Sequence, residues 1–269
     1  MLTIQTWGGW GDILREIALL PVRFGRWKVR HLPASAVAIR PDAAAPAAEE
    51  VRSLLERIPG IVWDGEGAVT KAEKVQARLL RRAIEYFHPR LFDPGFRWRT
   101  SDEIAETKKR RFIVQTHLQG LPSKQWDRRL WIELLQATAE IFPDHDVEVL
   151  DPAGDVFRSA GFVVHDRLTL PQAIRLVESA DRLLSIDSWS KYVAAWRGIP
   201  QLVIVPDQRS DYPQLTAQAV WKYSFRGVRD AQLVGITTDR KPQYTIGSMK
   251  RFQPSDILSA LRLLRSRGS

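Results

Sequence analysis

Short apolar runs alternate with amphipathic stretches along the first part of the chain. The runs have the composition of β-strands, and the stretches repeat their apolar residues with the 3.6-residue period of an α-helix. This alternation predicts strands at residues 2–7, 27–32 and 61–63, and helices at 13–20, 43–58 and 71–87. In the last of these helices the spacing predicts one inward face, made of Val75, Leu79, Ala83 and Tyr86. Strands that alternate with helices predict a parallel α/β sheet.

The pattern fails between residues 88 and 109 and then resumes. Pro89, Pro94 and Gly95, followed by the charged run 107–111, are typical of a connector. The resumed alternation predicts strands at 112–115, 147–150, 162–164, 183–186 and 202–205, and helices at 129–141, 170–180, 191–196 and 256–265. We therefore expect two α/β lobes, residues 1–106 and 107–269, with packing of the last helix back on the first lobe as one option. Such folds bind ligands at the carboxyl ends of their strands, and here also in a cleft between the lobes.

The composition excludes several classes of protein. The 269 residues are 44% hydrophobic and 26% charged, which is typical of a soluble globular protein and not of a disordered one. The absence of cysteine excludes disulfides, thiolate zinc sites and thiol catalysis. No apolar run reaches the roughly 18 residues of a membrane span. No secretory signal opens the chain, so we expect a cytoplasmic protein.

The charge is strongly positive, with 40 Lys+Arg against 31 Asp+Glu and a formal net charge of +9. Such a balance indicates nucleic acid, an anionic membrane face or phosphorylated small molecules as partners. Residues 71–111 alone carry an excess of six positive charges. Because this stretch ends the first predicted lobe, we expect that lobe to receive an anionic partner.

The first candidate site is the turn Gly8-Gly9-Trp10-Gly11-Asp12, which follows a predicted strand and opens a helix. Glycines there let the backbone turn sharply and leave room for a substrate. Asp12 falls in the first helical turn, where the positive end of the helix dipole favours a carboxylate. If it faces a cleft, that carboxylate can act as a general base; otherwise it is an ordinary helix cap.

Two further candidate sites suit phosphate groups. The segment Asp187-Ser188-Trp189-Ser190-Lys191-Tyr192 lies between a buried strand and a short apolar helix. The free N–H groups of a helix start, two serine hydroxyls and a lysine suit a diphosphate, although these residues can also cap the helix without a ligand. Lys124 lies in the loop after the first strand of the second lobe, where a lysine either neutralises a phosphate or is merely solvated.

Other motifs are absent from the sequence. Leu14 stands where a dinucleotide-binding G-x-G-x-x-G requires its third glycine, and neither a P-loop nor a G-x-S-x-G elbow occurs. The five histidines lack the spacing of a zinc site, and Asp144-His145-Asp146 precedes a strand instead of following one. We therefore expect no metal site.

Taken in order, the segments resemble glycosyltransferase family 9, the ADP-heptose:lipopolysaccharide heptosyltransferases. Its members have two Rossmann-like lobes with parallel sheets and a cleft between them, the GT-B architecture. The Gly-Asp turn and proline-ended helix of the family match Gly11–Pro21 here. The K-x-W-P element matches Lys124–Trp126, with Asp127 in place of the proline, and the nucleotide-sugar segment matches residues 170–200.

The resemblance implies an inverting glycosyltransferase that uses a nucleotide-sugar co-substrate, needs no other cofactor and works without a metal. Asp12 would be the general base that takes the proton of the acceptor hydroxyl. The donor diphosphate would contact Lys124, Ser188, Ser190 and Lys191. The donor sugar or nucleoside would contact Asp187, Tyr192, Asp151 and Arg209. The acceptor would contact Gly9, Trp10, Gly11, Lys71 and Arg78.

Two departures from the family pattern leave the donor sugar open: Trp189 replaces a glycine, and Tyr192 replaces a histidine. The acceptor is open too. An envelope glycan such as lipopolysaccharide would place the protein peripherally at the inner membrane. A phage-type DNA glycosyltransferase, working in the host cytoplasm, would use the basic stretch for DNA and stack an extruded base on Trp10, Trp98 or Trp126. An inactive nucleotide- or nucleic-acid-binding module is the third alternative, and the sequence leaves the oligomeric state undetermined.

Overall fold

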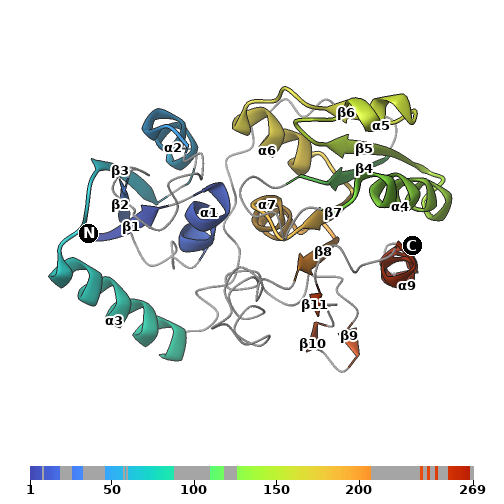
Figure 1. The fold of residues 1–269 in the computed structure, drawn as a ribbon. Helices are drawn as coiled ribbons and strands as arrows, with labels where there is room; N and C mark the ends of the chain where they lie inside the picture. The colour runs from blue at the N-terminus through green and yellow to red at the C-terminus, as the bar shows by residue number, and fades with distance from the viewer. Residues whose placement is uncertain are drawn as a thin grey trace. The chain divides into compact units, whose positions relative to one another are not determined.

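The chain folds into two compact α/β units, residues 1–103 and 104–269, each with its own parallel sheet. The computed structural model describes residues 1–7, 9–18, 26–32, 46–56, 58, 60–87, 110–117, 126–206, 237–238, 241–242, 246–247 and 254–266. Figure 1 shows the order of the elements along the chain. Within the described part of the chain, no helix is long and apolar enough to span a membrane.

The first unit has a three-stranded parallel sheet in the order β1-β2-β3. Its strands are β1 (Leu2–Trp7), β2 (Trp27–Leu32) and β3 (Ile61–Glu66), and its helices are α1 (Trp10–Ala18), α2 (Ala48–Leu55) and α3 (Lys71–Phe87). Buried residues alternate along β2, as a strand with one covered face requires. The predicted helical spacing of α1 is confirmed, because Ile13, Leu14 and Ile17 are all buried.

The predicted inward face of α3 is wrong at Val75 and Leu79, while the side chains of Ala83 and Tyr86 lie outside the described part of the structure. Val75 and Leu79 are 49% and 61% exposed, and Ala77 is the residue that is buried. At the helix start Glu73 and Thr70 form a capping box, in which the Glu73 carboxylate accepts the Thr70 backbone N–H at 2.7 Å. These bonds, with a smaller contribution from the Thr3 side chain of β1, lower the pKa of Glu73. The contact with Thr3 and the burial of Ala77 show that this side of the helix, with Glu73 and Ala77 one turn apart, meets the sheet.

The second unit has a six-stranded sheet in the order β11-β8-β7-β4-β5-β6. Its strands are β4 (Arg110–Gln115), β5 (His145–Leu150), β6 (Val163–His165), β7 (Arg182–Ile186), β8 (Gln201–Pro206) and β11 (Ile246–Gly247), and all the recorded pairings between them are parallel. A separate antiparallel pair joins β9 (Thr237–Thr238) and β10 (Lys241–Pro242). The helices are α4 (Arg128–Ile141), α5 (Asp155–Ser159), α6 (Leu170–Glu178), α7 (Ser190–Arg197) and α9 (Pro254–Ser266).

The strand order reverses between β4 and β7. From β4 the chain builds outward through β5 to β6, and it then returns to the other side of β4 with β7 and β8. In doubly wound sheets the loops diverge at such a reversal and leave a crevice outside the carboxyl ends of the two strands. The fold therefore places the ends of β4 and β7 where a ligand is expected.

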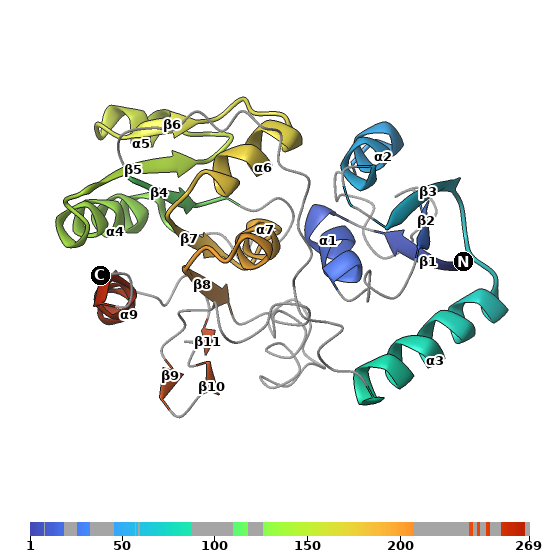
Figure 2. The same cartoon turned by 180° about the vertical axis from the view of Figure 1, so that it is seen from behind.

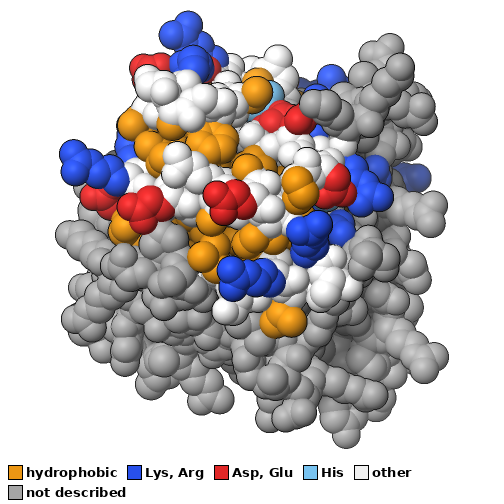
Figure 3. Space-filling model, turned by 90° about the vertical axis from the view of Figure 1, so that its right-hand side faces the viewer, with side chains coloured by type: hydrophobic (Ala, Val, Ile, Leu, Met, Phe, Trp, Pro, Cys, Tyr) orange, Lys and Arg blue, Asp and Glu red, His pale blue; other side chains and the backbone are white. Residues whose placement is uncertain are grey.

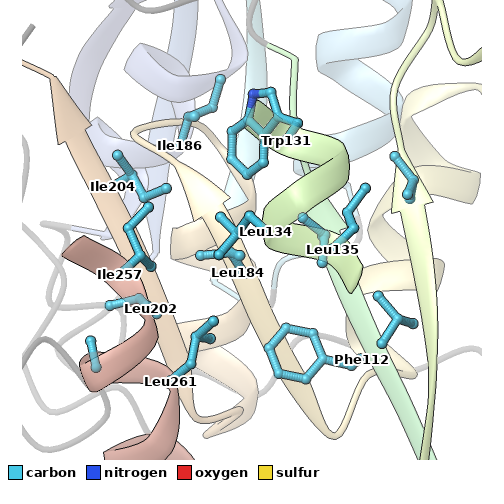
Figure 4. Packing of buried hydrophobic residues seen from close by; sticks show 14 of the residues in the cluster. Phe112, Trp131, Leu134, Leu135, Leu184, Ile186, Leu202, Ile204, Ile257 and Leu261 are labelled. Atoms are coloured by element: carbon cyan, nitrogen blue, oxygen red, sulfur yellow. The ribbon is translucent and has the colours of Figure 1, made fainter. Parts of the chain in front are cut away.

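The core of the second unit lies between its sheet and the helices α4 and α9 (Figure 4). Ile257 and Leu261 of α9 belong to the same buried cluster as Trp131 of α4. The last helix thus packs its apolar residues within its own unit; its packing on the first lobe stays a prediction. Figures 1 and 2 show α6 and α7 on the side of the sheet away from α4 and α9.

Candidate functional site

Polar side chains from three neighbouring strands meet at the carboxyl edge of the second sheet. Gln115 ends β4, and its amide donates a hydrogen bond of 3.1 Å to the Ser188 hydroxyl, which follows β7. On the other side of β4, the Thr116 hydroxyl donates to the carboxylate of Asp151, which follows β5. Asp151 also accepts the Ala153 backbone N–H at 2.7 Å. These bonds fix side chains on both sides of β4, including the topological reversal between β4 and β7.

A buried ion pair lies beside them. Lys191 is 2% exposed and Asp187 is 7% exposed, and the lysine ammonium donates to the Asp187 carboxylate one helical turn earlier. The backbone N–H of Asp187 is bonded to Ile204 of β8 at 2.9 Å, which holds its backbone at the sheet edge. The Tyr192 ring centroid lies 4.9 Å from the Lys191 ammonium, within the range of a cation–π contact. The lysine is therefore held by two neighbours.

The start of α7 leaves polar groups unsatisfied. The Ser190 hydroxyl and the Oε1 atom of Gln115 are buried, and neither has a hydrogen-bond partner among the residues that the structure describes. No side chain caps the helix at Trp189. Buried polar groups in native proteins are nearly always hydrogen-bonded, and the first N–H groups of a helix attract anions. These orphan groups favour a polar, anionic ligand at this edge.

Six of the predicted donor residues are brought together here: Asp151, Asp187, Ser188, Ser190, Lys191 and Tyr192. Lys124 and Arg209 lie outside the described residues. The structure shows a role for Lys191 that the sequence did not reveal: its ammonium group forms an ion pair with the Asp187 carboxylate. Gln115 and Thr116 were missed as well, and the available signal was their polar character at the end of a predicted strand.

The Asp12 turn lies in the first unit, at the carboxyl end of β1. Asp12 and Ile13 donate backbone N–H bonds to the Gly9 carbonyl at 3.0 and 3.1 Å, which starts α1. Arg15, which is almost fully buried, donates to the Asp12 carboxylate at 2.9 Å and holds it in place. The Asp12 side chain remains 23% exposed. A buried arginine thus supports a carboxylate that reaches solvent.

The backbone at Gly9 does not itself require a glycine. Gly9 does not have a positive φ, and a Cβ atom built on it would meet nothing within 4 Å. Trp10 opens α1 and is half-buried. Lys71 and Arg78 are exposed on α3, which is distant in sequence from the turn that holds Asp12.

Trp126 is not available for base stacking. It is buried in the core of the second unit, where its ring packs edge-on against Trp131 with the centroids 5.0 Å apart. It thus anchors the residues just before α4 to the core. Within the described ranges, no group of three or more acidic, histidine or cysteine residues is arranged for a metal ion.

The arrangement of strands and side chains is that of a GT-B fold: two parallel α/β units, one with polar side chains at its sheet reversal and one with a carboxylate after its first strand. Comparison with solved structures agrees. The chain is similar to E. coli ADP-heptose lps heptosyltransferase II, with a TM-score of 0.54 and 14% identity, over 99% of this chain and 99% of that chain. It is also similar to the glycosyl transferase family 9 protein of Veillonella parvula, with a TM-score of 0.55 and 12% identity, over 99% of this chain and 97% of that chain.

At these low identities the likeness shows the fold. The predicted fold is confirmed: the chain has the fold of glycosyltransferase family 9. No protein-family model and no curated protein matches the sequence.

Proposed function

We propose that this protein is a nucleotide-sugar-dependent glycosyltransferase that transfers a sugar to a hydroxyl group of an anionic acceptor in the cytoplasm. The observation that carries the proposal is the buried edge between β4 and β7, where the Ser190 hydroxyl and Gln115 Oε1 have no partner among the described residues. A diphosphate would satisfy the Ser190 hydroxyl and the N–H groups that open α7. The ribose or sugar hydroxyls would satisfy Gln115 Oε1, which can only accept.

The second unit would hold the donor. Asp151 and Asp187 are acceptors for donor hydroxyls, and Ser188 and Ser190 are donors to the phosphates. One neighbour in fold is named as a heptosyltransferase that uses ADP-heptose, so ADP-heptose is the first donor to test.

The first unit would supply the base. Asp12 would take the proton of the acceptor hydroxyl while the oxygen forms its bond to the anomeric carbon of the donor. The bond from that carbon to the diphosphate oxygen breaks at the same time, its electron pair leaves with the diphosphate, and the configuration inverts. Arg15 orients the Asp12 carboxylate through one oxygen. Preorganised donors at the departing diphosphate are each worth about 3 kcal/mol in such a step.

Lys191 would act on the donor through Asp187. An unpaired buried carboxylate beside a diphosphate would repel it, because like charges interact strongly at low dielectric. The Lys191 ammonium cancels that charge and fixes the carboxylate, so that this pair carries no net charge before the donor binds. Direct contact of Lys191 with a phosphate remains a prediction.

The test is a panel of nucleotide sugars, with ADP-heptose included, scored by the rise in melting temperature and by release of the nucleoside diphosphate. We expect one donor to stabilise the wild type, and Ser190→Ala to reduce that effect. Ser159→Ala is the matched control, since its hydroxyl is exposed on α5 and bonds within its own helix to the Asp155 carbonyl. No stabilisation and no hydrolysis with any donor would overturn the proposal.

A further inference from the structure

Helix α3 carries an apolar stripe that the first unit does not cover. Val75 and Leu79 are 49% and 61% exposed, and their i, i+4 spacing places them next to each other on the helix surface. The opposite side packs on β1 through Ala77, which is buried. The helix therefore has two apolar sides, and only one of them packs against the rest of the first unit.

Cations lie along one side of this stripe. Lys71, Lys74 and Arg78 are exposed, and Lys71 and Arg78 are i, i+4 and i, i+3 neighbours of Val75 on the helix surface. Glu73 is the acidic residue of the same stretch, and its carboxylate is bound to Thr70 and Thr3 on the other side of the helix. The exposed side of α3 is therefore positive and apolar at once.

The face drawn in Figure 3 also carries hydrophobic side chains, but they lie among lysine, arginine, aspartate and glutamate side chains, with both signs of charge close together. Val163 and Leu263 of the second unit are exposed as well, but they lie on different elements, the strand β6 and the helix α9. Single exposed apolar residues of this kind are common on soluble proteins.

We infer that the exposed side of α3 docks on an anionic membrane surface. Lys71, Lys74 and Arg78 lie at the level of the lipid phosphates, and Val75 and Leu79 insert between the head groups. A helix with one basic and apolar side lies in the plane of the interface in this way, and does not cross the bilayer. Duplex DNA would use the three cations but gives no reason for two exposed aliphatic side chains beside them.

This inference does not depend on the proposed transfer reaction, because membrane binding is measured without a donor. If it is correct, it locates the acceptor of the proposed reaction on a lipid surface and makes the first unit the side that meets it. Loss of vesicle binding would leave the donor-binding test of the second unit unaffected, so the two proposals fail separately.

The test is co-sedimentation of the full chain with vesicles of phosphatidylcholine alone and with about one-third phosphatidylglycerol. We expect binding to the anionic vesicles only, with an affinity that falls about fivefold for each cation removed in Lys71→Ala, Lys74→Ala or Arg78→Ala. The double variant Val75→Ser/Leu79→Ser is expected to lose about tenfold or more, because it removes the inserted apolar surface. Val163→Ser/Leu263→Ser is the matched control and should bind as the wild type does.

Three results would overturn the inference. The first is a wild type that does not bind anionic vesicles. The second is binding that survives Val75→Ser/Leu79→Ser, which would assign the attraction to charge alone; duplex DNA binding under the same salt would then identify nucleic acid as the partner. The third is a wild type that binds no vesicles, together with a lower melting temperature for Val75→Ser/Leu79→Ser than for the control pair. That result would show that the stripe is covered by protein.

Discussion

The ammonium group of Lys191 lies buried against the carboxylate of Asp187, one helical turn earlier, at the point where the second sheet reverses its strand order. The pair joins the end of β7 to the first turn of α7. Each charge is almost fully removed from water, so each depends on the other for compensation.

Replacement of one partner should therefore be far more costly than replacement of both. We expect Lys191→Met to lower the free energy of unfolding by about 3–5 kcal/mol, because it leaves the Asp187 carboxylate buried without its cation. The double variant Asp187→Asn/Lys191→Met should recover most of that loss. Urea unfolding of the two single variants and the double variant measures the coupling directly. Equal, additive losses would show that the two charges are solvated independently.

Ser190 provides the opposite case, a polar group whose removal should cost no stability. Its buried hydroxyl has no partner among the described residues, so we expect Ser190→Ala to remove no hydrogen bond to them and to leave the free energy of unfolding unchanged or slightly raised. The proposed donor loses a hydrogen bond, and we expect its dissociation constant to rise about five- to tenfold. Calorimetric titration with the nucleotide sugar and thermal unfolding without it separate the two effects. A variant that is less stable but binds the donor normally would show that the hydroxyl has a structural function.

Asp12→Asn should remove the general base and leave donor binding intact. We expect the transfer rate to fall by roughly 10²–10⁴-fold, while the donor-induced rise in melting temperature stays the same. Asp155→Asn is the matched control, since Asp155 also lies in the first turn of a helix and also pairs with an arginine three residues later, Arg158. If the two variants transfer sugar at similar rates, Asp12 is not the base.

The sequence predicted most of the elements because their periodicity is local. Strands and helices of the second unit repeat their apolar residues with clear spacing, and the segment from Asp187 to Tyr192 was recognised by its place between a strand and a helix. The bond from Gln115 to Ser188 was not foreseen, because it joins residues 73 positions apart and depends on which strands become neighbours. The Asp187–Lys191 pair did have a local signal, the i, i+4 spacing of opposite charges.

Side-chain burial was harder to predict than secondary structure. Helix α3 has two apolar sides, and hydrophobic spacing alone does not say which one meets the sheet. The contact from Glu73 to Thr3 of β1 and the burial of Ala77 show which side it is, and both arise only when the helix packs on the sheet. Trp126 shows the same limit, because aromatic residues suit a core and a binding surface equally well, and only its contact with Trp131 distinguishes the two.

His31 should make the first unit sensitive to mild acid. Its ring is buried on β2, where Nδ1 lies 3.2 Å from the Thr6 hydroxyl and Nε2 has no partner among the described residues. Burial lowers the pKa of His31 below its ordinary value of 6.5, and the nearby Glu66 opposes that shift less strongly. As the pH falls below about 6.5, the unfolded chain binds a proton that the folded chain refuses, so stability is lost until the folded pKa is reached.

His31→Asn removes this titration. We expect the wild type to lose stability between pH 7.5 and 5.5 and the variant to lose less, whatever its stability at pH 7.5, when urea unfolding is measured at both values. The slope with pH is the informative quantity, since the substitution also changes packing and the bond to Thr6. Parallel slopes for the two proteins would show that the His31 ring is protonated as easily in the folded chain as in the unfolded one, which its burial against Thr6 on β1 should prevent.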